Sequence, residues 1–141
     1  MRDHPDATRD DMVKTIATAR LLFGGSMNIQ APPNLTPDRY ELYLEAGIND
    51  WGGVSPLTPD FINPEAPWPA LTLLREKSAE AGFDLKARLP VYPEFIRRGE
   101  EFLSRTVLAQ VQALADSGGL VKNGGPLRFL SSLQNSTAPT L

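Results

Sequence analysis

The sequence predicts an α/β fold of about three βα units with parallel strands, and two observations lead to this prediction. Four stretches repeat apolar side chains at helical spacing, and glycine or proline marks the limits of most of them. Three strand-like runs stand between these stretches, and each leads into a turn that contains proline. Short strands that alternate with helices are typical of a parallel sheet covered by its helices.

The first helix is expected from about residue 9 to residue 23. Thr8 is suited to cap its N-terminus, with Asp11 three residues further on as the acid of a capping box. The pair Gly24–Gly25 ends it. Its inward face is expected to contain four apolar side chains at helical spacing: Met12, Ile16, Ala19 and Phe23.

A short strand is expected at residues 27–31, because two consecutive prolines stop the run abruptly. In the next helix Thr36 is the expected cap, and Pro37 takes the first helical position, where its missing N–H costs nothing. This helix ends at Gly47. Its inward side chains are expected to be Tyr40, Tyr43 and Leu44.

The stretch from residue 47 to residue 69 organises the rest of the chain. Its first residues, Ile48–Trp51, are expected to form a short buried strand, and the glycines and prolines from Gly52 onward predict a loop. A loop of this length within a compact domain is uncommon and is usually functional.

The second half continues the alternation. A helix is expected at residues 69–81, with Gly82 as its stop. Residues 84–92 alternate polar and apolar side chains, which predicts a third strand. From Glu94 the pattern predicts one long helix, or two helices broken near Gly99.

Three strands cannot close a barrel, because a closed eight-stranded α/β barrel takes roughly 200 residues or more. Residues 1–121 are therefore expected to be part of a barrel, and residues 122–141, rich in Gly, Ser, Thr and Pro, to be a flexible tail. Three explanations stay open for the missing units. Another polypeptide supplies them, the chain associates with itself, or it is a fragment that is marginally stable alone.

Composition narrows the class of protein. The chain has 141 residues, 41% hydrophobic and 22% charged, and a net charge of −3, as in a soluble globular domain. This balance predicts no nucleic-acid and no membrane partner, and the cytoplasm as compartment. The chain has no cysteine, and its single His4 lies in a charged N-terminal segment, so no metal ligand is expected.

Polar side chains gather where each predicted strand meets its following loop: Gln30 and Asn34, then Asn49 and Asp50, then Arg88 and Tyr92. In α/β barrels the loops at the carboxyl ends of the strands hold the active site. These residues are therefore candidates for binding a small-molecule substrate, and no catalytic residue is assigned. A turn-forming role is the alternative for the asparagines and the aspartate, and an ordinary salt bridge for the arginine.

Aromatic and glycine residues of the central stretch also have two readings. Trp51 and Trp68 are suited to stack on an aromatic substrate, or to pack in the core with the indole N–H bonded. Gly52 and Gly53 would let the backbone approach a ligand closely, although a simple turn explains them equally well.

Four runs resemble the C-terminal part of FO synthase, or 7,8-didemethyl-8-hydroxy-5-deazariboflavin synthase. They are HPDATRDDMVKTIATARLLFG, MNIQAPPNL, GINDWGGVSPLTPDFINPEAPWP and LKARLPVYPEFI, and the resemblance covers about residues 4–117. It implies part of a radical-SAM (β/α) TIM-like barrel from deazaflavin coenzyme biosynthesis. It also implies S-adenosylmethionine and a 4Fe-4S cluster as the family's cofactors, and a tyrosine–diaminouracil adduct as substrate.

The chain departs from this family in one respect. The CxxxCxxC motif that binds the cluster belongs to the N-terminal part of the family, and this chain has no cysteine. The resemblance therefore implies a C-terminal part that is inactive alone and needs the N-terminal part of the barrel, or a partner polypeptide. The alternative hypothesis is a non-catalytic α/β module that binds a small molecule or a partner through the same loops.

Overall fold

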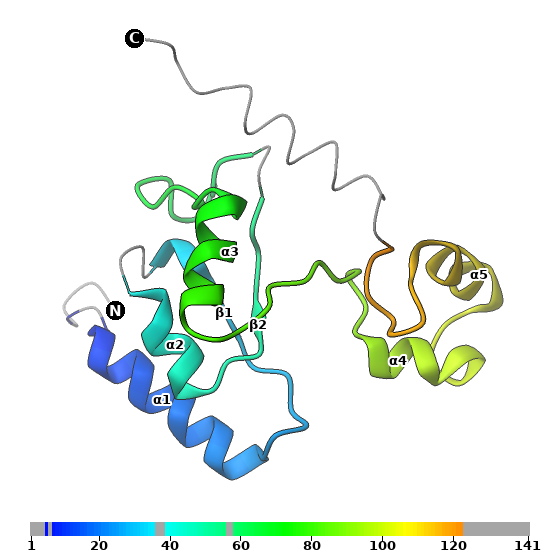
Figure 1. The fold of residues 1–141 in the computed structure, drawn as a ribbon, viewed down its shortest axis with the longest axis horizontal. Helices are drawn as coiled ribbons and strands as arrows, with labels where there is room; N and C mark the ends of the chain where they lie inside the picture. Colours follow the sequence, from blue (N-terminus) through cyan, green and yellow to red (C-terminus); the bar gives the residue numbers. More distant parts are fainter. Residues whose placement is uncertain (1–4, 6, 36–38, 56–57, 123–141) are drawn as a thin grey trace, which may run out of the picture. The chain divides into compact units, whose positions relative to one another are not determined.

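The computed structural model describes residues 5, 7–35, 39–55 and 58–122. The chain divides into two compact units, with the boundary between Asp84 and Leu85. The first unit contains three α-helices, a short 3-10 helix and two strands (Figure 1). In chain order these elements are α1 (Arg9–Phe23), β1 (Gln30–Ala31), η1 (Pro33–Leu35), α2 (Tyr40–Ala46), β2 (Asp50–Trp51) and α3 (Leu71–Glu80).

Helix α1 confirms the predicted first helix and its capping box. The Asp11 backbone N–H donates to Thr8 Oγ1 (3.2 Å), and the Thr8 N–H donates to Asp11 Oδ2 (3.0 Å). Ile16 is buried as predicted, whereas Phe23 is 58% exposed. Helix α1 has 15 residues and is about 22 Å long, whereas its neighbour α2 has 7 residues and is about 10 Å long. The last turn of α1 therefore runs past the helix it packs on.

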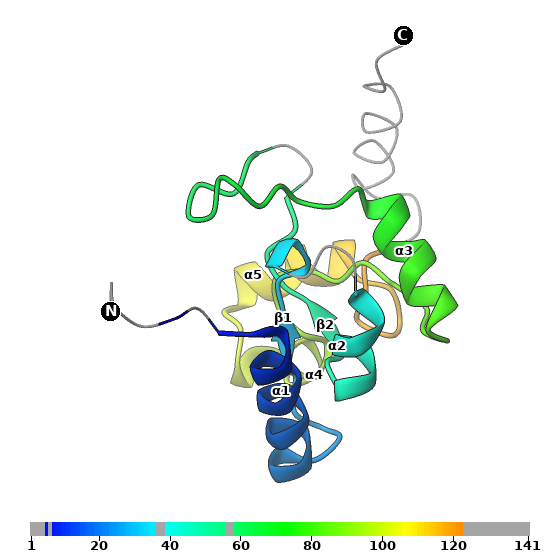
Figure 2. The same cartoon turned by 90° about the vertical axis from the view of Figure 1, so that its left-hand side faces the viewer.

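Strands β1 and β2 pair in parallel, with Gln30 opposite Asp50 and Ala31 opposite Trp51. The predicted strands at residues 27–31 and 48–51 are thus confirmed in type and in place, but each is only two residues long. Backbone bonds from Asn49 to Ile29 and from Gly52 to Ala31 extend the pairing at both ends. Helices α1, α2 and α3 lie beside one face of this pair, and Figure 2 shows α1 and α2 in front of it.

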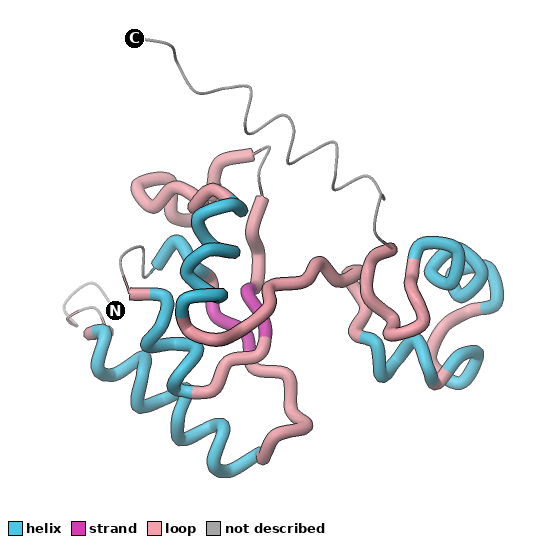
Figure 3. Tube along the Cα trace, viewed as in Figure 1, coloured by secondary structure: helices cyan, strands magenta, loops and turns pink. Residues whose placement is uncertain are grey.

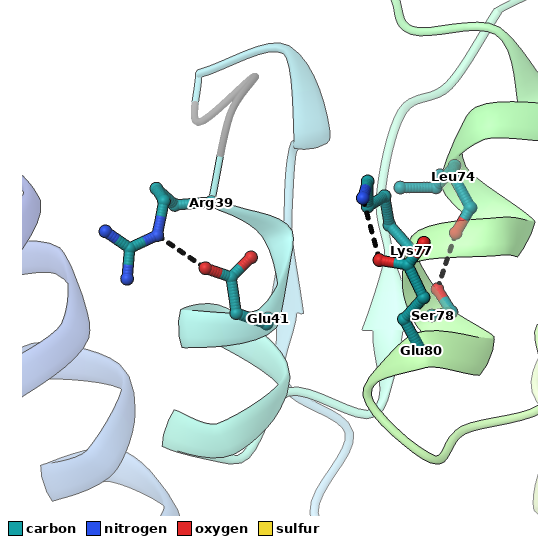
Figure 4. Close-up of polar contacts among 6 residues, drawn as sticks. All are labelled: Arg39, Glu41, Leu74, Lys77, Ser78 and Glu80. Atoms are coloured by element: carbon teal, nitrogen blue, oxygen red, sulfur yellow. Dashed lines mark hydrogen bonds and ion pairs between the residues drawn. The ribbon is translucent and has the colours of Figure 1, made fainter.

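The core of the first unit lies between the helices and the strand pair. Trp51 makes an edge-on contact with Tyr40, with 5.8 Å between the ring centroids. Its indole N–H donates to Ser78 Oγ (3.4 Å), whose hydroxyl donates to the Leu74 carbonyl (2.7 Å; Figure 4). The buried apolar residues of the unit are Ile16, Ala31, Tyr40, Tyr43, Leu44, Ile48, Trp51 and Leu74.

Two ion pairs flank this core on α2 and α3 (Figure 4). The hydrogen bond from Arg39 lowers the pKa of Glu41, and the bond to Glu80 raises the pKa of Lys77. All four side chains are more than a third exposed, so these pairs stabilise the unit weakly. The predicted cap at Thr36 and Pro37 lies outside the described residues.

The second unit is helical: α4 (Pro93–Arg97), the 3-10 helix η2 (Gly99–Glu101) and α5 (Arg105–Leu114). The alternative of two helices broken near Gly99 is confirmed. The predicted strand at residues 84–92 is wrong. Arg88 forms only an isolated antiparallel bridge with Leu120, and Pro90 has no N–H to donate to a ladder. The predicted tail lies outside the described residues, apart from Lys122.

Figure 3 shows how little of the described chain is strand and how much loop separates β2 from α3. The sheet is open, and about three parallel strands were expected where the described residues form two. None of the helices in the described ranges has both the length and the apolarity that a membrane crossing requires.

Candidate functional site

A pair of polar side chains lies on the first residues of the two paired strands. Gln30 on β1 and Asp50 on β2 are opposite each other in register, and Gln30 Nε2 donates to Asp50 Oδ2 (2.6 Å). The structure therefore brings these two predicted residues together. The parallel pairing explains this contact, because side chains in register on neighbouring parallel strands point to the same side of the sheet. Gln30 is exposed and Asp50 half-buried.

The backbone of the loop after β2 approaches this pair closely. A Cβ atom at Gly52 would lie 3.0 Å from Gln30 Oε1, and one at Gly53, which has a φ of +76°, would lie 3.3 Å from the Trp68 ring. Both glycines thus allow the loop to pass beside side chains of this unit, as a residue with a larger side chain would not. Trp51 packs in the core, in agreement with the second of its two readings.

Asn49 acts on the chain's own backbone. Its Oδ1 accepts from the Ile29 N–H (2.8 Å), and its Nδ2 donates to Asn28 Oδ1 (2.9 Å). These bonds hold the segment that enters β1 against the segment that enters β2. The structure supports the structural reading for Asn49, because its amide is engaged on both sides.

Arg20 on α1 is a residue that sequence reasoning missed. Its guanidinium donates to three backbone carbonyls, those of Gly47 (2.7 Å), Gly24 (2.6 Å) and Met27 (2.8 Å), and to Asn49 Oδ1 (3.3 Å). The five N–H groups of arginine, in a planar fork, suit such a cluster of acceptors. Arg20 therefore ties the end of α1 to the turns that lead into both strands. A sequence signal was lacking, since its partners lie up to 29 residues away.

Asn34 on η1 connects the first βα turn to the long loop. Its side chain is buried, and Nδ2 donates to Asp60 Oδ2 (2.9 Å) and to the Ala66 carbonyl (3.0 Å). Asn34 thus has a structural role, as in the alternative interpretation. It holds a distant part of the long loop and not only its own turn.

Asp60 folds that loop, and sequence reasoning did not single it out. Its Oδ1 accepts from the backbone N–H groups of Ile62 (2.9 Å) and Asn63 (3.2 Å), and its Oδ2 accepts from the side chains of Asn63 (3.1 Å) and Asn34. These donors, led by the side chain of Asn63, lower the pKa of Asp60 to about 2. The bonds organise the loop directly across from the first βα turn.

The low pKa of Asp60 predicts acid sensitivity of the loop. Because the pKa falls from 3.8 to about 2 on folding, the charged carboxylate stabilises the folded loop above pH 3.8, and this contribution is lost as the pH falls to about 2. We expect the stability difference between the parent chain and Asp60→Asn to shrink from pH 4 to pH 2 in urea unfolding.

A matched variant controls for the loss of charge. Glu65→Gln removes one negative charge from the same exposed loop while leaving the Asn34–Asp60 contact in place. A constant difference between the parent chain and Asp60→Asn across this pH range would contradict the assignment of Asp60 as the organiser of the loop.

Arg88 and Tyr92 belong to the second unit. The Arg88 guanidinium lies over the Tyr92 ring, 4.2 Å from its centroid, and donates to the Leu89 carbonyl (2.8 Å). The structure thus brings these two predicted residues together as a cation–π pair.

The described ranges contain no group of three or more His, Cys, Asp and Glu side chains that could hold a metal ion. A 4Fe-4S cluster needs thiolate ligands, and the full sequence has no cysteine. The polar groups on and beside the strands of the first unit are neutral amides and one carboxylate. Their oxygen atoms can accept hydrogen bonds from the hydroxyl and N–H groups of a polar small molecule.

Comparison with known proteins finds similar proteins over most of this chain. It is 55% identical over 116 residues to an FO synthase of Streptomyces avermitilis, covering 82% of this chain and 14% of the relative. It is 46% identical over 129 residues to an FO synthase of Mycobacterium tuberculosis, covering 90% and 15%. No family model and no solved structure matches the chain.

A third relative is matched over a larger share of its own length. The chain is 45% identical over 122 residues to the 7,8-didemethyl-8-hydroxy-5-deazariboflavin synthase of Methanopyrus kandleri, covering 86% of this chain and 36% of the relative. The predicted resemblance to FO synthase is confirmed over most of the chain. It spans between about a seventh and about a third of the length of these relatives.

Proposed function

We propose that this chain is the C-terminal part of a radical-SAM FO synthase that forms 7,8-didemethyl-8-hydroxy-5-deazariboflavin from a tyrosine–diaminouracil adduct. The observation that carries the proposal is the Gln30–Asp50 pair on two parallel strands, in a chain 45% identical to a synthase named for this product. Ligands of open α/β sheets bind outside the carboxyl ends of the strands, where the loops that follow β1 and β2 begin.

The match to the Methanopyrus relative supports this assignment. Matches of similar length cover 36% of the Methanopyrus relative but only 14% of the Streptomyces relative. The Methanopyrus protein is therefore less than half as long as the Streptomyces protein. The region that this chain shares with both therefore belongs to the shorter synthase as well. We infer the product of the complete enzyme from the name of that synthase.

The chain's own residues would bind and orient ligands. Asp50 is a carboxylate that accepts hydrogen bonds from ribose hydroxyls or a uracil N–H, and Gln30 holds one of its oxygens in a fixed direction. In the second unit, Arg88 over Tyr92 offers a cation for a carboxylate group. These roles are binding roles, and no residue of this chain is assigned to a bond-breaking step.

The cluster of a radical-SAM enzyme does not fit this chain, since its thiolate ligands are missing from the sequence. We therefore propose that the N-terminal part of the barrel, or a partner polypeptide, supplies it. Apolar side chains that a complete barrel would cover remain exposed in the first unit: Leu21 at 85%, Leu22 at 74%, Phe61 at 82% and Ile62 at 88%.

The proposal is tested by reconstitution. The purified chain alone, given reductant and S-adenosylmethionine, should form no 5′-deoxyadenosine. Co-expression with the N-terminal part of an FO synthase should give the fluorescent deazaflavin product. Formation of 5′-deoxyadenosine by the isolated chain, or absence of product from a well-folded complex, would overturn the proposal. A stable, concentration-independent monomer without product would favour the binding module instead.

Within that complex, Asp50→Asn should lower kcat/KM for product formation by about 10- to 100-fold, because a hydrogen bond to a charged acceptor is lost. The amide still accepts from Gln30, so the fold should persist. Glu45→Gln removes the same charge from an exposed site on α2 and should leave kcat/KM unchanged. Equal activities of the two variants would contradict a binding role for Asp50.

A further inference from the structure

The buried amide of Asn34 has one oxygen that the described chain does not use. Asn34 is 3% exposed, and both of its bonds run from Nδ2, to the Asp60 carboxylate and to the Ala66 carbonyl. Both partners are acceptors, so the amide cannot turn around without placing oxygen against oxygen. The orientation of the amide is therefore set, with Nδ2 directed at these two acceptors.

Oδ1 of Asn34 has no hydrogen-bond partner within the described ranges. Buried polar atoms are almost always bonded, and an exception requires an explanation, such as a water, an ion or a ligand that supplies the missing donor. The side chain cannot move its oxygen into solvent, because Asp60 and Ala66 hold the nitrogen on the opposite side. Asn34 lies three positions after Ala31, the last residue of β1, so this acceptor follows the carboxyl end of that strand.

We propose that Asn34 Oδ1 accepts a hydrogen bond from an N–H or O–H group of the bound small molecule, and so selects for a donor at that point of the ligand. This inference rests on the proposed function. The chemistry of the surroundings specifies the group, since the Asp60 carboxylate lies 2.9 Å from the same amide. A hydroxyl, an amine or a ring N–H suits this site, and a phosphate or carboxylate is repelled from it.

The test compares two alanine variants in the reconstituted complex. Asn34→Ala removes the unused oxygen together with a bond to Asp60, whereas Asn63→Ala removes a bond to Asp60 and leaves that oxygen in place. Asn34→Ala should raise KM at least about tenfold for one of two ligands, S-adenosylmethionine or the tyrosine–diaminouracil adduct. Asn63→Ala should change neither KM by more than about twofold.

Ligand analogues sharpen the assignment. An analogue of the affected ligand in which one N–H is methylated or one hydroxyl is absent should bind about tenfold more weakly to the parent complex. The same analogue should bind the Asn34→Ala complex as well as the complete ligand does, because the two changes remove one shared bond. Independent, additive losses would overturn the inference.

A second measurement needs no variant. In the parent complex labelled with ¹⁵N-asparagine, the side-chain amide signals of Asn34 should shift when the affected ligand is added. No shift with either ligand, or equal KM values in the two alanine variants, would show that a buried water occupies this position. Product from the parent complex tests the proposed function separately, so the two ideas fail by different observations.

Discussion

Replacing Leu74 with alanine is expected to unfold the first unit under conditions in which the parent chain is folded. Leu74 on α3 is 1% exposed, and its carbonyl accepts from the Ser78 hydroxyl that also receives the Trp51 indole N–H. Leucine-to-alanine changes at buried sites cost about 2–5 kcal/mol in free energy of unfolding. The sheet has only two strands of two residues each, so it adds little to the free energy of unfolding that could offset such a loss.

The adjacent residue offers a matched control. Leu73 is 39% exposed on the same helix, so Leu73→Ala should change the free energy of unfolding by less than about 1 kcal/mol. Urea unfolding followed by circular dichroism measures both variants. Equal destabilisation by the two changes would mean that α3 does not pack through Leu74 in solution.

Replacing Gly47 with alanine is expected to separate α1 from the turn that leads into β2. Gly47 has a φ of +110°, and a Cβ atom there would lie 2.7 Å from Arg20 Cγ and 2.9 Å from Arg20 Cβ. The strained backbone costs about 1–3 kcal/mol, and overpacking costs a similar amount. Moving Arg20 aside would break its bonds to the Gly47 carbonyl and to Asn49, so relief of the clash is costly too.

Gly24→Ala isolates the backbone part of this cost. Gly24 also has a positive φ, +73°, but a Cβ atom there would meet nothing within 4 Å. Its alanine variant should lose only the backbone cost, about 1–3 kcal/mol of unfolding free energy, without the cost of overpacking. Thermal unfolding of both variants, with the parent chain, gives the comparison. A smaller loss for Gly47→Ala than for Gly24→Ala would contradict the role assigned to Arg20.

The helices were predictable because the signals that specify them are local. The Thr8–Asp11 capping box spans three residues, and the turn after α2 is marked by Gly47, which indeed adopts the left-handed conformation. The break near Gly99 was likewise visible as one of two alternatives. Each of these features depends on atoms a few positions apart, and the side chains themselves encode them.

The third strand was predicted wrongly because pairing is not local. Residues 84–92 alternate as a strand does, but alternation says nothing about which neighbour is present to complete the ladder. In the structure Arg88 meets only Leu120, in an antiparallel bridge. The same limitation concealed the contact of Asp60 with Asn34 and the contacts of Arg20 with Gly47 and Asn49, which join residues 26 to 29 positions apart.

The sequence alone predicted the α/β alternation, the first helix and its cap, and the positions of the two strands. It also predicted the resemblance to FO synthase. Only the tertiary structure decided which polar residues meet, that Gln30 faces Asp50, that Asn49 serves the backbone and that Asn34 holds the loop through Asp60. The reason is physical. Helix signals are carried by neighbouring residues, whereas strand register and side-chain hydrogen bonds depend on the approach of distant segments, which only the packed chain specifies.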